Sequence, residues 1–262
     1  MVFVIDNVKL DFKNPAFIFI YKYKYIKRMK NLNIFSLIAE YENAKSGGVL
    51  NKPNVSFVDE DSSVRYLLKL DFTHNGYEYV DLGLPSGLKW ATCNVGAESP
   101  EHSGMYFTWG ETKGYTIDDI NSNIRSFNKL EYKYNSASLI SDNLTHKRDA
   151  VHSYMGGSWR TPMNKDFTEL IKNTYKTWID DYNKTGVSGL LLTSKTNGNS
   201  IFFPASGFCY NSLIGRMGSG GFYWTASIDS YVDAWYMYLG ENNQFVLSDA
   251  RYCGFTLRGV FN

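Results

Sequence analysis

The chain has 262 residues, 44% of them hydrophobic, which is enough for one large domain or for a domain with a smaller module. Its net charge of +1 supplies no overall field for nucleic acid or acidic membranes. The three cysteines exclude complete intrachain pairing, and no CxxC or Cys/His cluster predicts zinc. We expect buried free thiols, although Cys209 and Cys253 would pair if the fold brought them together.

The first 28 residues are basic and strand-like, with Tyr21, Tyr23 and Tyr25 alternating with lysines. We interpret residues 1–28 as an extension ahead of Met29, and a strand that pairs with another segment is the alternative. The apolar run 16–20 is too short for a signal-peptide core, and no small-residue cleavage site follows it. No stretch reaches the roughly 18–20 apolar residues that span a bilayer, so we expect neither a secretion signal nor membrane insertion.

Residues 29–76 are predicted to form a small N-terminal module. Apolar side chains at helical spacing favour a short helix over residues 31–45. Residues 55–58 and 64–70 alternate as two arms of a hairpin around a polar turn at 59–63. The module therefore consists of a helix and a hairpin.

From Tyr77 onward, glycines, tryptophans and short predicted strands alternate, and residues 77–262 are predicted to form the main domain. Residues 112–147 are expected to be a long surface loop with short helical turns. Thr161 is a predicted N-cap with Pro162 at the first helical position, and Asn197-Gly198 is a type I′ turn signal. Strands are expected at 79–82, 88–93, 106–109, 189–194, 200–204, 222–228, 235–239, 244–247 and 254–260.

Seven sequence motifs in this region occur in a recognisable order. They are YVDLGLPSGLKWA at 79–91, NVGA at 94–97, YFTWGET at 106–112, GGSWRTP at 156–162, TSKTNGNSIFFPA at 193–205, YWTAS at 223–227 and GFTLR at 254–258. Together they resemble a paralogous domain abundant in Bacteroidetes and Fibrobacter proteins. The resemblance implies an α+β, C-type lectin-like fold with short antiparallel strands, one or two helices and long loops. It also implies kinship with formylglycine-generating enzymes and with variable proteins of diversity-generating retroelements.

A shorter motif, PNVSFV at 53–58, resembles a module found ahead of this domain in structural proteins of phages that infect Bacteroidetes. A virion protein needs no signal peptide, which agrees with the expected absence of one. The resemblance therefore implies a virion surface, and an extracellular or cell surface is the alternative.

Catalysis and metal binding are not expected from the residues. Formylglycine-generating enzymes use a close pair of C-terminal cysteines, whereas Cys209 and Cys253 lie far apart in the sequence. The four histidines have no ligand spacing, and the short calcium-binding motifs of lectins are absent. The oxygens of residues 241–243 would suit calcium but equally form a turn. We therefore expect no catalytic residue, no metal and no cofactor, with an oxidase as the least favoured alternative.

The last third of the sequence is the predicted recognition region. Aromatics make up 16% of the chain, and no lysine follows Lys195, a composition that suits interfaces because ordering lysine is costly. If Trp235, Met237 and Leu239 face the core, strand alternation turns Tyr236 and Tyr238 outward. The candidate ligand-binding residues are Tyr210, Asn211, Arg216, Phe222, Asp229, Ser230, Tyr231, Asp233, Tyr236, Tyr238, Asn242, Asn243, Arg251 and Tyr252.

The other residues within the motifs are assigned to the scaffold. We expect Trp90, Trp109, Trp159 and Trp224 in the core, with Arg160 and Arg258 as structural residues. The hypothesis is a non-enzymatic receptor or ligand-binding protein whose target is a cell-surface protein or glycan, with no nucleic acid partner. Its ligand face is diversified by a retroelement in one version of this hypothesis. A structural subunit that uses the domain for assembly is the alternative, and a homo-oligomer is left open.

Overall fold

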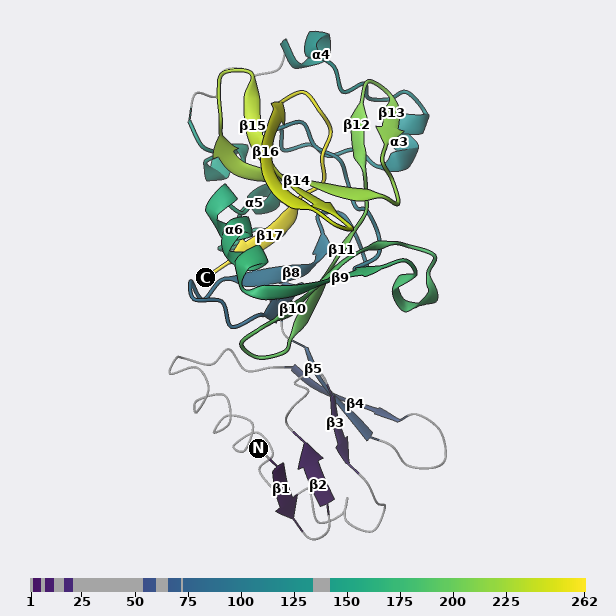
Figure 1. The fold of residues 1–262 in the computed structure, drawn as a ribbon, viewed down its shortest axis with the longest axis vertical. Coiled ribbons are helices and arrows are strands. Elements are labelled where there is room, and N and C mark those ends of the chain that lie inside the picture. Colours follow the sequence, from purple (N-terminus) through teal and green to yellow (C-terminus); the bar gives the residue numbers. More distant parts are fainter. Residues whose placement is uncertain are drawn as a thin grey trace. The chain divides into compact units, whose positions relative to one another are not determined.

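The structure is a computed structural model. It describes residues 2–5, 8–11, 17–20, 54–59, 66–71, 73–133 and 142–262, with side chains from residue 73 onward except 133. The chain divides into two compact units, Met1–Thr73 and His74–Asn262 (Figure 1). Among the described residues, no helix is long and apolar enough to cross a bilayer.

The first unit contains two small antiparallel sheets. Strand β1 (Val2–Ile5) pairs with β2 (Val8–Asp11), and β5 (Tyr66–Asp71) lies between β3 (Phe17–Ile20) and β4 (Asn54–Asp59). The antiparallel pairing of β4 with β5 confirms the hairpin predicted between residues 55 and 70. The helix expected at 31–45 falls outside the described residues.

The second unit consists mainly of four antiparallel sheets. One has the order β17-β8-β7-β6, with β6 (Thr73–His74), β7 (Tyr77–Asp81), β8 (Lys89–Asn94) and β17 (Arg258–Phe261). The second has the order β11-β10-β9, with β9 (Thr174–Ile179), β10 (Gly189–Ser194) and β11 (Ser200–Pro204). The third is the hairpin of β12 (Phe208–Tyr210) and β13 (Leu213–Gly215). The fourth joins β14 (Gly220–Ile228), β15 (Asp233–Gly240) and β16 (Gln244–Ala250).

The helices of the described residues are short. They are α3 (Ile117–Asn121), α4 (Lys129–Lys133), α5 (Ala150–Met155) and α6 (Asn164–Lys172), with 3₁₀ turns η3 (His146–Arg148) and η4 (Tyr182–Lys184). Because strand residues far outnumber helical residues, the protein is mostly β and the expected α+β class is wrong; the fold is not identified as C-type lectin-like. Helix α6, at nine residues, is the longest described, so helices cannot form a layer of their own.

Local sequence signals located most of these elements. Strands β10 and β11 have the predicted bounds, and the short helices and 3₁₀ turn within 112–147 agree with the expected loop. The turn between β10 and β11 is not type I′, because five residues separate the strands and only Gly198 has a left-handed φ, +78°. The strand expected at 106–109 is reduced to isolated bridges at Tyr106 and Phe107. The strand expected at 254–260 is regular only from Arg258.

Helix α6 begins later than predicted, for a tertiary reason. Its N-cap is Met163, not Thr161. The Thr161 hydroxyl donates instead to Asp149 Oδ1 at 2.6 Å, and the Thr161 amide donates to Asp149 Oδ2 at 2.8 Å. Asp149, whose carboxylate also accepts from the first amides of α5, thus ties the segment before α6 to α5.

Two large clusters of buried side chains form the core. The four tryptophans assigned to the core are confirmed, since each is at most 1% exposed. Arg258 is also confirmed as structural, because its guanidinium donates to Ala91 O, Phe202 O and Asn94 Oδ1 at 2.9–3.0 Å. The β14–β15–β16 sheet lies between the clusters: Phe222, Trp224 and Tyr236 pack into one, and Tyr223, Met237 and Leu239 into the other.

Candidate binding face

The register of the β14–β15–β16 sheet sets two rows of side chains across it. Phe222 is opposite Tyr238, and Tyr238 is opposite Phe245. In the next row Trp224 is opposite Tyr236, and Tyr236 is opposite Leu247. Directly opposite residues of antiparallel strands point to the same side. These six side chains therefore share one face of the sheet.

Exposure rises steadily across this face. Phe222 and Tyr236 are each 7% exposed, Tyr238 is half-buried, and Phe245 and Leu247 on β16 are 50% and 41% exposed. The core thus continues into an uncovered apolar surface at the outer strand. Exposed apolar residues scattered singly are ordinary, whereas a contiguous apolar area next to polar groups marks an interaction site.

The β12–β13 hairpin extends the face beyond β14 (Figure 1). Bridges join position 207 to 221 and position 209 to 254, and the Phe208 ring lies 4.9 Å from the Phe222 ring. At the tip of β12, the Tyr210 ring lies 6.1 Å from the ring of Tyr252, which packs against the same core cluster. We call this surface the aromatic face. It comprises Tyr210, Phe222, Tyr236, Tyr238, Phe245, Leu247 and Tyr252.

Two glycines fix the position of the Tyr238 ring. A Cβ at Gly220 would lie 2.8 Å from that ring, and one at Gly240 would lie 2.6 Å from the phenol oxygen. The tyrosine therefore lies flat over two backbone positions that only glycine leaves open. A ring held in this way presents its edge without further loss of side-chain freedom.

Charged groups border the aromatic face without dominating it. Burial raises the pKa of Tyr236 to about 12; the Asp249 carboxylate acts in the same direction and the Arg216 guanidinium opposes it. Burial also raises the pKa of Tyr252. Tyr236 and Tyr252 are therefore neutral at pH 7 and act as hydrogen-bonding, apolar surface.

The structure brings together part of the predicted ligand set. Tyr210 and Tyr252 are neighbours, and Arg251 beside them donates to the carbonyl oxygens of Ser230 and Asp233. Asp229, Ser230, Tyr231 and Asp233 form the turn at this end of β15. Exposed in this group are Tyr210, Asn211, Asp229 and Tyr231.

Other predicted ligand residues are separated or buried. Asn242 and Asn243 are exposed at the opposite end of β15, roughly 25 Å away at about 3.4 Å per residue. The outward orientation predicted for Tyr236 is wrong, because the sheet is buried on both sides. Phe222 and Arg251 are also buried, and Arg251 lies 4.7 Å over the Trp109 ring as an anchor for the turn.

The candidate ligand-binding residues left out several exposed apolar residues of this region. Phe245 and Leu247 were assigned to a strand and were not among those candidates, and Leu213 on β13 is 74% exposed. The sequence held a usable signal, because the odd-numbered residues of 244–250 lie on the same side of the sheet as Tyr236 and Tyr238. Its use required the knowledge that β16 is the outer strand of the sheet.

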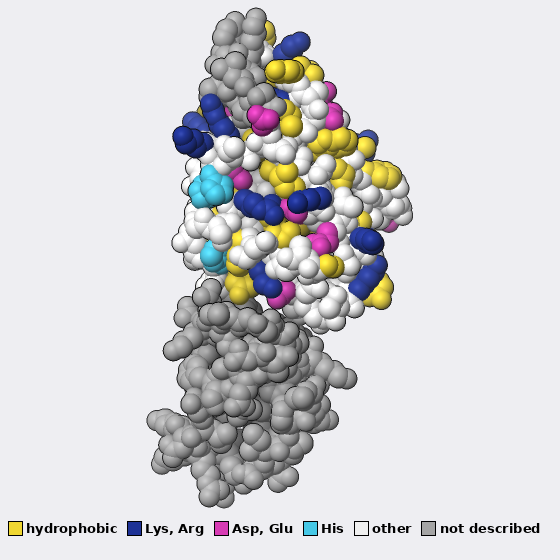
Figure 2. All heavy atoms as spheres, turned by 90° about the vertical axis from the view of Figure 1, so that its left-hand side faces the viewer, with side chains coloured by type: hydrophobic (Ala, Val, Ile, Leu, Met, Phe, Trp, Pro, Cys, Tyr) yellow, Lys and Arg dark blue, Asp and Glu magenta, His cyan; other side chains and the backbone are white. Residues whose placement is uncertain are grey.

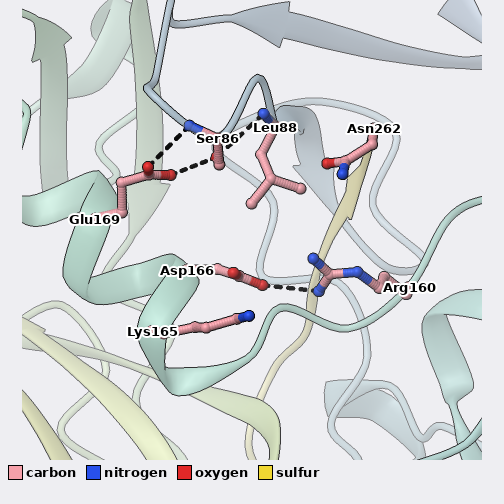
Figure 3. Close-up of a pocket in the computed structure, with 7 residues that line it drawn as sticks. All are labelled: Ser86, Leu88, Arg160, Lys165, Asp166, Glu169 and Asn262. Carbon is pink, nitrogen blue, oxygen red and sulfur yellow. Dashed lines mark hydrogen bonds and ion pairs between the residues drawn. The ribbon is translucent and has the colours of Figure 1, made fainter.

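A pocket beside α6 is the second candidate site (Figure 3). It has a volume of about 340 Å³ and is lined by Ser86, Leu88, Arg160, Lys165, Asp166, Glu169 and Asn262. Figure 2 shows the side of the molecule that holds α5 and α6, where basic and acidic side chains alternate around small apolar areas. The described part of that side forms no patch of one sign.

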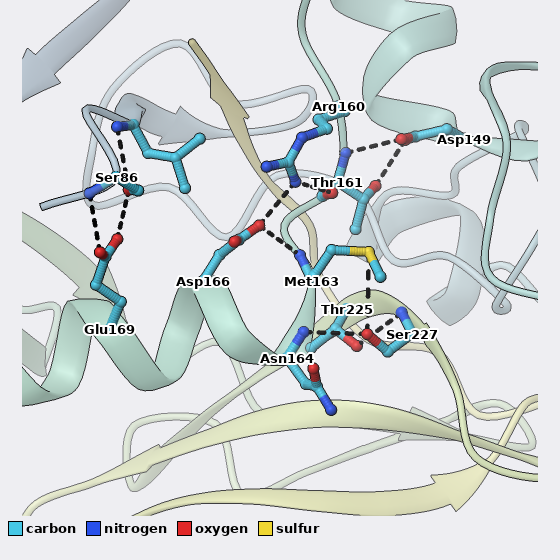
Figure 4. Close-up of polar contacts among 11 residues, drawn as sticks. Ser86, Asp149, Arg160, Thr161, Met163, Asn164, Asp166, Glu169, Thr225 and Ser227 are labelled. Atoms are coloured by element: carbon cyan, nitrogen blue, oxygen red, sulfur yellow. Dashed lines mark hydrogen bonds and ion pairs between the residues drawn. The ribbon is translucent and has the colours of Figure 1, made fainter. Parts of the chain in front are cut away.

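The pocket's acids are already matched by protein partners (Figure 4). Asp166 Oδ2 accepts from Arg160 Nη1 and from the Met163 amide, both at 2.8 Å. Glu169 accepts from the Ser86 amide at 3.0 Å and from the Ser86 hydroxyl. These contacts fix the start of α6 against neighbouring loops, and they agree with the predicted structural role of Arg160.

The cysteines are free, as expected. Burial raises the pKa of both Cys209 and Cys253 to about 12, so each is a thiol and a poor nucleophile at pH 7. Within the described residues, no group of three or more His, Cys, Asp or Glu side chains is arranged to hold a metal ion.

Comparisons with known proteins add no assignment. No protein-family model, no curated protein and no solved structure matches the chain. The functional argument therefore rests on the two surfaces described above.

Proposed function

We propose that this chain is a binding protein whose aromatic face engages a protein or glycan on a target cell, as a component of a phage tail or a cell surface. The observation that carries the proposal is the continuity of the face. Apolar surface runs from buried Phe222 to half-exposed Phe245 along a single row of a sheet that is packed on both sides. A target that covers this face buries apolar area on a scaffold that is already ordered.

The composition of the face supports recognition rather than catalysis. Tyrosines provide large, rigid contact area, and neighbouring Ser, Asn and Asp side chains provide adaptable hydrogen bonds. Tyr210 and Phe245 are 46% and 50% exposed, so each has surface to lose on binding. The nearby thiols are buried and protonated, which leaves them without a nucleophilic role at neutral pH.

The test is binding of the purified protein to intact Bacteroidetes cells and to a glycan array, with and without EDTA. The informative variant is Tyr210→Ala, because Tyr210 is exposed on the face and its ring lies 6.1 Å from that of Tyr252. Loss of a central aromatic contact is worth about 2 kcal/mol, so we expect roughly 30-fold weaker binding.

The matched control is Tyr175→Ala on β9, an exposed tyrosine outside the face, which should bind like the wild type. Binding that survives EDTA and is lost only with Tyr210 supports the proposal. Equal affinity of the two variants, or no saturable binding to cells or glycans, would contradict it.

One observation favours the alternative of a structural subunit. The outermost strand of the sheet, β16, exposes apolar side chains along an edge. Such an edge can serve assembly, and the two functions separate experimentally. An assembly surface loses its oligomer when mutated, whereas a ligand surface loses target binding with its oligomer unchanged.

A further inference from the structure

Strand β16 ends its sheet with an open edge. The sheet order is β14-β15-β16, and among the described residues no backbone hydrogen bond reaches residues 244–249 from any segment other than β15. Its sequence, QFVLSDA, contains no lysine, no proline and no bulge against β15. Natural proteins use these devices to block edge pairing, because an open apolar edge is a template for another strand.

We propose that two copies of this chain pair through β16, antiparallel and about a twofold axis at Val246. A twofold axis perpendicular to a sheet keeps each face on its own side, so residues on the aromatic face meet residues on the same face of the second copy. With the axis at Val246, Phe245 lies opposite the partner's Leu247, and Leu247 lies opposite the partner's Phe245.

The remaining pairs of this register are also compatible. Gln244 meets the partner's Ser248, and Asn243 meets the partner's Asp249, so no like charges are opposed. Moving the axis by one residue to Leu247 would put Phe245 opposite the partner's Asp249 and expose an apolar ring to a carboxylate. Of these two registers, the sequence of β16 favours the one with its axis at Val246.

This pairing would join two three-stranded sheets into one of six strands. Both aromatic faces would lie on the same side, because the axis is perpendicular to the sheet. The dimer does not depend on the face being a receptor surface. If the face does bind a target, two adjacent copies gain avidity on a surface that repeats the target.

The first experiment measures molar mass by light scattering. The wild type should have twice the 29.9 kDa of one chain, and Leu247→Lys or Phe245→Glu alone should have the single-chain mass. The double variant Phe245→Glu/Leu247→Lys should regain the dimer, because each new carboxylate faces a new ammonium across the axis. Phe245 and Leu247 are 50% and 41% exposed, so every variant should still fold and unfold cooperatively, with the single-chain variants less stable only by the lost association.

The second experiment tests the register through a disulfide. In a Cys93→Ser background, Val246→Cys places two thiols opposite each other, at a Cα separation of about 4.5–5.5 Å that a disulfide spans. We expect a covalent dimer under mild oxidation. The control Ser248→Cys faces the partner's Gln244 and should stay uncrosslinked.

The two experiments separate this inference from the proposed function. A wild type with the mass of one chain overturns the dimer, as do dimers that persist in both single variants. Crosslinking of the residue-248 variant but not the residue-246 variant overturns the register. Target binding is measured separately with Tyr210→Ala, because Tyr210 lies on β12 and not on β16.

Discussion

The aromatic face and the pocket beside α6 differ in whether the protein itself supplies partners for their side chains. In the pocket, Asp166 and Glu169 are matched by an arginine, two amides and a hydroxyl of the protein itself. On the face, Phe245 and Leu247 have exposed apolar area that no described residue covers. A pocket whose polar groups are hydrogen-bonded within the protein stabilises the fold, whereas exposed apolar area on a rigid sheet favours the binding of a partner.

The largest effect on stability should come from the buried centre of the face. Tyr236→Ala removes a ring that stacks 5.7 Å from Phe222 and lies 4.8 Å from Phe255. We expect a loss of about 3–5 kcal/mol in the free energy of unfolding, as for other buried aromatics. Urea denaturation measures it; a loss below 1 kcal/mol would mean that Tyr236 is a surface residue.

Alkaline pH should weaken the fold through the thiols beneath the face. The pKa of Cys253 is raised from 9.0 to about 12, so unfolding releases a proton between these values. The contribution of the protonated Cys253 thiol to the free energy of unfolding is complete below pH 9. It declines as pH rises toward 12, by about 1.4 kcal/mol per pH unit. Denaturation at stepwise higher pH should show a shallower decline in Cys253→Ala, and unchanged slopes would contradict buried titration.

The pocket should respond to mutation in stability alone. Asp166→Ala removes the acceptor of Arg160 Nη1 and of the Met163 amide. We expect a loss of about 1–3 kcal/mol in unfolding free energy, with target affinity unchanged. A large fall in affinity at unchanged stability would move the binding site from the face to the pocket.

The sequence predicted the parts of this structure that depend on neighbours along the chain. Strands β10 and β11 were located to the residue because alternation and turn residues are local signals. The start of α6 was misplaced because Asp149, twelve residues earlier than Thr161, takes the hydroxyl that would cap the helix. This competition for the Thr161 hydroxyl comes from a tertiary contact, which the local sequence pattern does not reveal.

The candidate face shows the same difference between local sequence signals and tertiary contacts. Tyr210 and Tyr252, both candidate ligand-binding residues, lie near one another, whereas the outward orientation predicted for Tyr236 failed because it assumed that one side of the sheet faces solvent. The β14–β15–β16 sheet has core on both sides, so its exposed residues lie along an edge strand. The α+β expectation failed because it came from a resemblance and not from helical periodicity along residues 77–262.

The most direct test compares Tyr210→Ala with Lys165→Ala in binding to intact target cells. Both side chains are exposed, one on the aromatic face and one at the pocket, and neither change should alter the unfolding transition. Roughly 30-fold weaker binding for the tyrosine variant, with the lysine variant like the wild type, is the predicted result. The reverse pattern would contradict the account and assign recognition to the pocket.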